Sequence, residues 1–99
     1  MITRIVKLHF QEDKIQEFLD FFETIKHKVN TFPGCKGMRL VQDNYNRQTI
    51  MTISDWDSKI DLNTYRDSET FGQVWSKIKP WFENKPEVWT TEVVFNGFP

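Results

Sequence analysis

The sequence predicts an α+β protein of the ferredoxin-like βαββαβ type, in which a four-stranded antiparallel sheet carries two helices on one face. Two observations predict this fold. Hydrophobic residues repeat every second residue in four segments and every third or fourth residue in the segments between them, in the order β–α–β–β–α–β. Right-handed crossovers join such an order into a split βαβ sheet. The 99 residues show no repeat or linker and correspond to a single domain over residues 1–99.

The first strand is expected over residues 2–10, as an inner strand with apolar side chains on both faces. One face holds Ile2, Arg4, Val6, Leu8 and Phe10, and the other holds Thr3, Ile5, Lys7 and His9. A helix should follow and reach about Asn30, with Asp13 as its cap or as an acidic residue of its first turn. Its apolar stripe consists of Ile15, Phe18, Leu19, Phe22, Ile25 and Val29.

The second half of the chain is expected to form a hairpin, two helical segments and a last strand. The hairpin strands are residues 35–43 and 48–56, joined by turn-forming residues. Ser58 and Asp61 resemble a capping box that opens a short helix. A longer helix begins near Asp67 and Ser68, and Pro80 ends or kinks it because proline lacks the backbone donor. The last strand is expected over residues 87–95.

Charge and hydropathy exclude several classes of protein. Thirteen basic and fourteen acidic residues give a net charge of −1, which argues against a nucleic-acid partner. No apolar run of membrane-spanning length occurs, and the first ten residues do not resemble a signal peptide. Cys35 is the single cysteine, so neither an internal disulfide nor a cysteine-rich zinc site is expected. A cytoplasmic location fits these features best.

The aromatic content is high: nine Phe, four Trp and two Tyr. Two helices cover only one face of the expected sheet, yet the strands carry apolar residues on both sides. A large apolar face on a small protein is normally covered. We therefore expect a homodimer in which two copies pack their helix-free sheet faces together.

Two stretches of the chain resemble the antibiotic biosynthesis monooxygenase family, within the dimeric α/β-barrel superfamily. The first is the turn Phe32–Pro33–Gly34–Cys35, and the second is Trp56-x-Ser58 followed by Leu62, Tyr65, Ser68 and Phe71 at the family's usual offsets. The resemblance covers roughly residues 2–95. It implies a dimeric α/β barrel, with oxygenation of quinols or polycyclic phenols without a cofactor in some members and haem degradation in others.

The chain departs from this pattern at two positions. Many members have His where this chain has Tyr65. In the haem-degrading branch, the axial histidine lies at the position of Trp75, and an indole nitrogen cannot ligate iron. Haem cleavage by that arrangement is not expected. Binding of haem through another residue, or of a small molecule in a stress-response protein without chemistry, remains the alternative function.

Candidate site residues follow from side-chain chemistry. The chain has no histidine or cysteine pair at metal-ligand spacing, so we expect no metal site and no cofactor. Tyr65 and His9 are the candidate catalytic residues. His9 is chosen because imidazole is the usual base near neutral pH, and Tyr65 because it stands where many members of the family have histidine. His9 could reach the cavity or the partner subunit, depending on which face it occupies. The candidate residues for binding a small aromatic molecule are Trp56, Asn63, Phe71, Trp75 and Arg39. Aromatic residues at helical spacing form a core more often than a pocket, so a core is the other interpretation of these side chains.

Overall fold

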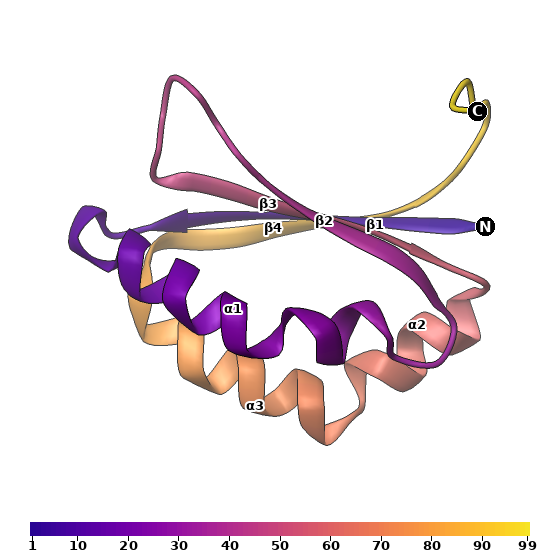
Figure 1. Ribbon diagram of the computed structural model, residues 1–99, viewed down its shortest axis with the longest axis horizontal. Coiled ribbons are helices and arrows are strands. Elements are labelled where there is room, and N and C mark those ends of the chain that lie inside the picture. Colours follow the sequence, from indigo (N-terminus) through magenta and orange to yellow (C-terminus); the bar gives the residue numbers. More distant parts are fainter.

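The computed structural model describes residues 1–99 as an open four-stranded antiparallel sheet with all helices on one face (Figure 1). The strands lie in the order β2-β3-β1-β4, as the ferredoxin-like arrangement requires. In chain order the elements are β1 Ile2–Phe10, η1 Glu12–Lys14, α1 Ile15–Asn30, β2 Cys35–Gln42, β3 Thr49–Trp56, α2 Lys59–Arg66, α3 Glu69–Ile78, η2 Lys79–Trp81 and β4 Phe82–Glu92. The predicted fold class is confirmed. The sheet is not closed into a barrel within one chain.

Strand β1 lies in the middle of the sheet and alternates as predicted. The even-numbered residues from Ile2 to Phe10 are all buried against the helices, and the odd-numbered ones are half-buried on the other face. Two apolar clusters fill the space between sheet and helices. Phe10, Phe18 and Ile50 belong to one, and Trp56 belongs to the other together with the residues of α2 that face the sheet.

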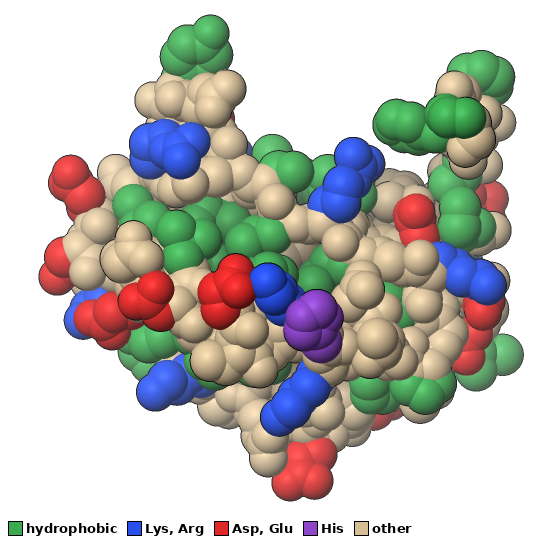
Figure 2. All heavy atoms as spheres, in the orientation of Figure 1, with side chains coloured by type: hydrophobic (Ala, Val, Ile, Leu, Met, Phe, Trp, Pro, Cys, Tyr) green, Lys and Arg blue, Asp and Glu red, His purple; other side chains and the backbone are tan.

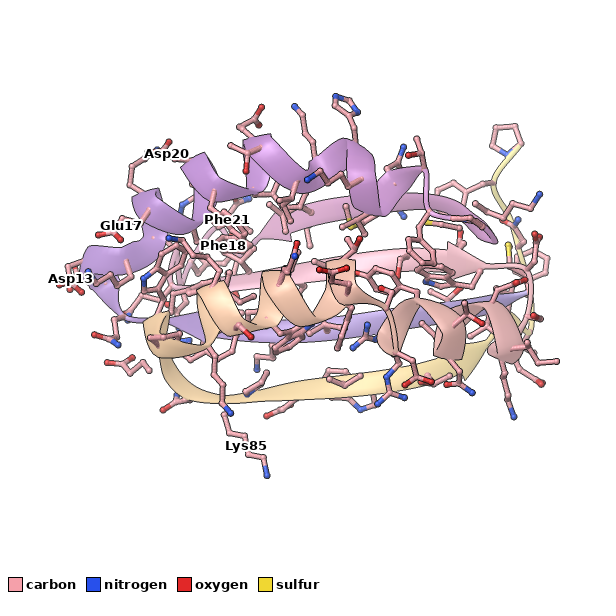
Figure 3. All side chains as sticks on the ribbon, turned by 90° about the horizontal axis from the view of Figure 1, so that it is seen from below. Asp13, Glu17, Phe18, Asp20, Phe21 and Lys85 are labelled. Carbon is pink, nitrogen blue, oxygen red and sulfur yellow. The ribbon has the colours of Figure 1, made fainter.

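Helix α1 covers β2 and β3 with its predicted stripe, of which Phe18 and Val29 are fully buried. Figure 3 shows Phe18 and Phe21 pointing inward, while Asp20 projects outward on the opposite side of the helix. A short 3₁₀ turn precedes α1, and no side chain caps either segment. Asp13 is therefore not a cap: it lies in the 3₁₀ turn just before α1, where its negative charge interacts favourably with the positive end of the helix dipole.

Gly34 allows the turn between α1 and β2 to pack against α2. Its backbone has φ +86°, in the left-handed region, and a β-carbon placed there would lie 2.4 Å from the β-carbon of Asp61. The Gly34 carbonyl also accepts a hydrogen bond from the amide of Asp57 at 2.9 Å. The Pro-Gly-Cys turn thus fixes where α2 begins.

Strand β4 covers residues 82–92 rather than the predicted 87–95. The predicted start is five residues too late. In the structure Pro86 lies in a bulge on this edge strand, where no backbone donor is needed. The strand ends early because Glu92 pairs with Ile2, the first residue of β1, so the residues that follow have no partner. They leave the sheet as a C-terminal segment, residues 93–99.

Candidate functional site

The sheet divides the predicted site residues between its two faces. Trp56, Tyr65, Phe71 and Trp75 lie between sheet and helices, where they belong to or pack against the core clusters. His9 and Arg39 lie on the helix-free face, because they alternate with residues that face the helices. Asn63 lies on the exposed side of α2 and lines neither of the two hollows described below.

An interior pocket of about 60 Å³ lies between the sheet and the helices. Most of its lining is apolar and comes from α1, α3 and the central strands. The polar side chains that reach it are Arg4, Thr52, Ser54 and Tyr65, and the Trp75 indole forms part of its wall. An engineered core cavity that holds a benzene molecule has roughly 150 Å³. Entry of a ring therefore requires movement of lining side chains, of which Phe22 and Trp75 are only half-buried.

An aromatic ladder leads along α2 and α3 to this pocket. The rings of Trp56 and Tyr65 stack with centroids 4.9 Å apart, and Phe71 meets Tyr65 edge-on at 5.3 Å. Trp75 follows at 5.6 Å from Phe71. Such pairs add about 0.5–1.5 kcal/mol each beyond their buried area. The rings thus hold one another in place and fix the orientation of the Tyr65 phenol.

Two serines cap the helices that carry this ladder. The hydroxyl of Ser58 accepts a hydrogen bond from the amide of Asp61 at 3.1 Å, so Ser58 caps α2 as predicted, and it also donates one to the Asp61 carboxylate at 3.1 Å. The hydroxyl of Ser68 accepts one from the amide of Phe71 at 3.2 Å and donates one to the carbonyl oxygen of Tyr65. The residues from Trp56 to Phe71 that resemble the family therefore include the caps of α2 and α3 and the aromatic rings that pack together.

Arg4 is the unusual residue of the pocket. It is 6% exposed, its Nε has no hydrogen-bond partner, and no ion pair of the chain includes it. Its guanidinium lies over the Phe71 ring, 5.3 Å from the centroid. Burial lowers the pKa of Arg4, the negative form of Tyr65 would raise it, and the nearby cation of Arg66 lowers it further. The cation thus has an aromatic neighbour and a second cation but no acid.

Tyr65 is as deeply buried as Arg4, at 6% exposure. Burial raises the pKa of its phenol to about 12; the Arg4 cation acts in the opposite direction, and Cys35 adds slightly to the rise. Tyr65 therefore stays protonated at neutral pH. It can donate a hydrogen bond to an oxygen in the pocket but cannot take a proton from it.

His9 lies on the helix-free face, and both of its ring nitrogens are engaged. Nδ1 is 3.0 Å from the hydroxyl of Thr49 on β3, and Nε2 is 3.0 Å from a carboxylate oxygen of Glu83 on β4. The sequence left open whether His9 faces the cavity under the helices or the opposite face of the sheet. The structure places it on the opposite face, away from the interior pocket. His9 ties three strands together beside the β4 bulge, and it does not meet Tyr65.

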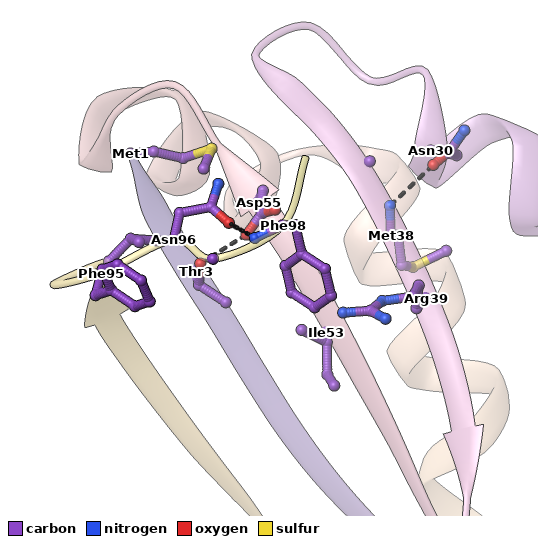
Figure 4. A pocket seen from close by; sticks show the side chains of 13 residues that line it. Met1, Thr3, Asn30, Met38, Arg39, Ile53, Asp55, Phe95, Asn96 and Phe98 are labelled. Atoms are coloured by element: carbon purple, nitrogen blue, oxygen red, sulfur yellow. Dashed lines mark hydrogen bonds between the residues drawn. The ribbon is translucent and has the colours of Figure 1, made fainter.

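Arg39 lines a second hollow, of about 470 Å³, on the helix-free face (Figure 4). The C-terminal segment forms one wall of it, and the guanidinium of Arg39 lies over the Phe98 ring at 5.8 Å. Thr3 donates a hydrogen bond of 2.6 Å to Asp55 at its floor. This hollow is larger but more open and more polar than the interior pocket. We take the interior pocket as the candidate site because it is lined by the buried Arg4, whose Nε has no hydrogen-bond partner.

The sequence profile of the antibiotic biosynthesis monooxygenase family matches residues 1–75. The chain belongs to this family. The matched region contains β1, the aromatic ladder and every polar residue of the interior pocket. No curated protein sequence matches the chain.

Solved structures of similar fold agree with this membership. A crystal structure described as an antibiotic biosynthesis monooxygenase gives a TM-score of 0.88 at 18% identity, covering 95% of this chain and 99% of that one. A protein of Caulobacter crescentus CB15 gives 0.87 at 20% identity, with 95% and 90% covered. A Mycobacterium tuberculosis protein gives 0.88 at 11% identity, with 98% of both chains covered. At these identities the likeness shows the fold. No helix of the chain is long and apolar enough to span a membrane.

Haem, the ligand of one branch of the antibiotic biosynthesis monooxygenase family, does not fit the interior pocket. A porphyrin is several times larger than benzene, and the pocket is smaller than a benzene cavity. Its lining contains neither histidine nor cysteine. No step of the chemistry below involves haem.

Arg4, Thr52 and Ser54 were not predicted as site residues. The signal for Arg4 was present, since it falls on the same face of β1 as four apolar residues. A charge on that face is either paired inside the protein or directed at a ligand. The two hydroxyl residues gave no comparable signal, because Ser and Thr are common in strands of every kind.

Proposed function

We propose that the protein is a monooxygenase that acts without a cofactor on a small aromatic molecule of the quinol type. The observation that carries the proposal is the interior pocket, in which apolar and aromatic walls surround the hydroxyl of a protonated, deeply buried tyrosine. Membership of the antibiotic biosynthesis monooxygenase family supports it. The pocket volume favours a single ring over a polycyclic phenol.

The reaction requires no external reductant. A 1,4-hydroquinone and O₂ give a hydroxyquinone and water: one oxygen atom enters a ring C–H bond, the other leaves as water, and the hydroquinone supplies all four electrons. The hydroquinone first loses a phenolic proton to water, which leaves negative charge on a ring oxygen, and the resulting anion passes the first electron to O₂. Donation from Tyr65 to that ring oxygen, in a pocket with little water, stabilises the anion.

Oxygen uptake with a panel of monocyclic hydroquinones tests the proposal. We expect turnover by the wild type above the rate of autoxidation, and a loss of about tenfold to a hundredfold in kcat for Tyr65→Phe, which keeps the ring but removes the donor. Tyr45→Phe is the matched control, because Tyr45 is fully exposed in the β2–β3 loop. No uptake above autoxidation with any hydroquinone would contradict the proposal.

A second function, binding without chemistry, is favoured by one observation. No histidine or carboxylate lines the interior pocket, so no side chain there takes a proton at neutral pH. Saturable binding of a hydroquinone without oxygen consumption would establish this second function. The free thiol of Cys35 fits a reducing compartment, so a cytoplasmic location is part of either proposal.

We also propose that two copies pack through the helix-free sheet face. One row of that face runs across all four strands, from Arg39 through Ile53 and Ile5 to Trp89. Trp89 is 45% exposed. The β2–β3 loop and the C-terminal segment rise on either side of this face (Figure 1), and both carry apolar side chains near their ends (Figure 2). A second copy would cover the face between these two projections.

A further inference from the structure

We propose that the interior pocket binds an aromatic carboxylate, and that Arg4 is the residue that holds its carboxylate group. The inference rests on the proposed use of this pocket as the ligand site, but not on the oxidation. It names the substrate class more narrowly than the proposed function does, as a single aromatic ring that carries a negative charge.

The buried charge of Arg4 would be stabilised by a neighbouring anion. A guanidinium keeps its charge under all physiological conditions, so it cannot lower the cost of burial by losing a proton. A buried ion without a partner is strongly destabilising. The contact with the Phe71 ring returns only part of that cost, and the neighbouring cation of Arg66 adds to it.

The chain supplies no such anion, although it has 14 acidic residues. The four ion pairs all lie at half-buried or exposed positions elsewhere. A methionine at position 4 would fill similar space between Ile2 and Val6 without a charge to desolvate. A buried arginine at this position therefore lowers the stability of the empty protein, and an anionic ligand removes that penalty.

The form of the anion follows from the groups around Arg4. The guanidinium is planar and its Nε–H is free, so it can offer two parallel donors to a carboxylate. The aromatic side chains of Trp75 and Phe22, which line the pocket, suit an attached aromatic ring. The hydroxyls of Tyr65 and Ser54 can each donate a hydrogen bond to a further substituent on the ring. The Ser54 hydroxyl accepts a hydrogen bond from the Trp56 indole at 3.0 Å, and its own proton is free to be donated. At about 60 Å³ the pocket accepts even one ring only when the half-buried side chains of Phe22 and Trp75 move, so a single ring is the ligand size we propose.

Calorimetric titration with benzoate, 4-hydroxybenzoate and the neutral benzamide tests the inference. We expect wild type to bind both acids at least about tenfold more tightly than benzamide. Arg4→Met should lose this preference, and Arg4→Lys should keep only part of it, because lysine lacks the planar pair of donors. Arg47→Met is the matched control, since Arg47 is exposed in the β2–β3 loop, and it should bind as wild type does.

Thermal unfolding supplies a second measurement that does not depend on affinity. Arg4→Met should raise the Tm of the empty protein by several degrees, which also shows that the variant folds. Benzoate should raise the Tm of wild type and leave that of Arg4→Met unchanged.

Three outcomes would overturn the inference: equal binding of benzoate and benzamide, unchanged benzoate binding by Arg4→Met, or no benzoate binding at millimolar concentration. These outcomes are separate from failure of the proposed function. Charge-selective binding without oxygen uptake leaves the Arg4 site intact, whereas oxygen uptake from neutral hydroquinones without charge selectivity leaves the monooxygenase intact.

Discussion

The hydroxyl of Tyr65 is a donor because of where the chain places it. Trp56 stacks on one face of its ring and Phe71 meets it edge-on, so the phenol is removed from water. Water stabilises a phenolate far better than an apolar core does, and the pKa rises to about 12 in consequence. Many members of the antibiotic biosynthesis monooxygenase family have histidine at this position, which can exchange a proton near neutral pH. In the proposed function, Tyr65 would donate a hydrogen bond to the substrate in place of that proton exchange.

The same pKa predicts a loss of stability at high pH. The folded state holds the Tyr65 proton up to about pH 12, while the unfolded chain releases it near pH 10. The unfolded state binds fewer protons in this window, so the free energy of unfolding falls as pH rises from 10 to 12, by roughly 2–3 kcal/mol in total. Urea unfolding at pH 9 and pH 11.5 measures it. Tyr65→Phe should lack this part of the decrease, and an equal decrease in both proteins would contradict the assignment.

At the scale of elements, hydrophobic period and cap residues predicted the helices well. The stripes of α1 and α3 and the capping serines depend on neighbours three or four residues away, which a sequence displays directly. The bounds of β4 depend on β1, more than 70 residues distant, and on a bulge that accommodates Pro86. No local pattern encodes that pairing, so the strand was shifted by several residues at its start.

The candidate site was predictable only in part, for a related reason. The aromatic ladder runs from the end of β3 into two consecutive helices, and its spacing is visible along the chain. Whether His9 faces the helices depends on which face of β1 is covered, and a shift of one residue reverses the answer. The polar floor of the pocket brings Arg4 together with residues of β3 about 50 positions away. Such a juxtaposition exists only in the folded sheet.

Ser68 connects the start of α3 to the position of Tyr65, which makes it a test of how the ladder is held. Ser68→Ala removes the cap on the amide of Phe71 and the bond to the Tyr65 carbonyl. We expect the free energy of unfolding to fall by about 1–2 kcal/mol. Ser76→Ala is the matched control, because Ser76 is exposed in the middle of α3 and alanine favours helix there. Similar effects of the two substitutions in urea unfolding would contradict the capping role.

At the scale of the whole molecule, the two faces of the sheet are unequally covered. Three helices bury the even-numbered side chains of β1, and nothing in the chain covers the row from Ile53 through Ile5 to Trp89 except the C-terminal segment at one end. Both projections of Figure 1 rise from this uncovered side. A two-fold axis through the face would bring each projection of one copy against its partner, so that a single operation covers the sheet and the exposed side chains of Phe95 and Phe98.

A charge on this face should separate the copies. Sedimentation of the wild type at low micromolar concentration should give twice the chain mass of 11.9 kDa. Trp89→Glu should give a single chain mass, because a carboxylate would be buried without a partner in the interface. Its circular dichroism should stay that of a folded protein, since Trp89 lies outside both core clusters. Ile60→Glu is the control: Ile60 is 77% exposed on α2, on the helical side, and should remain dimeric. A wild type that sediments as one chain would contradict the dimer and leave Trp89 in contact with water.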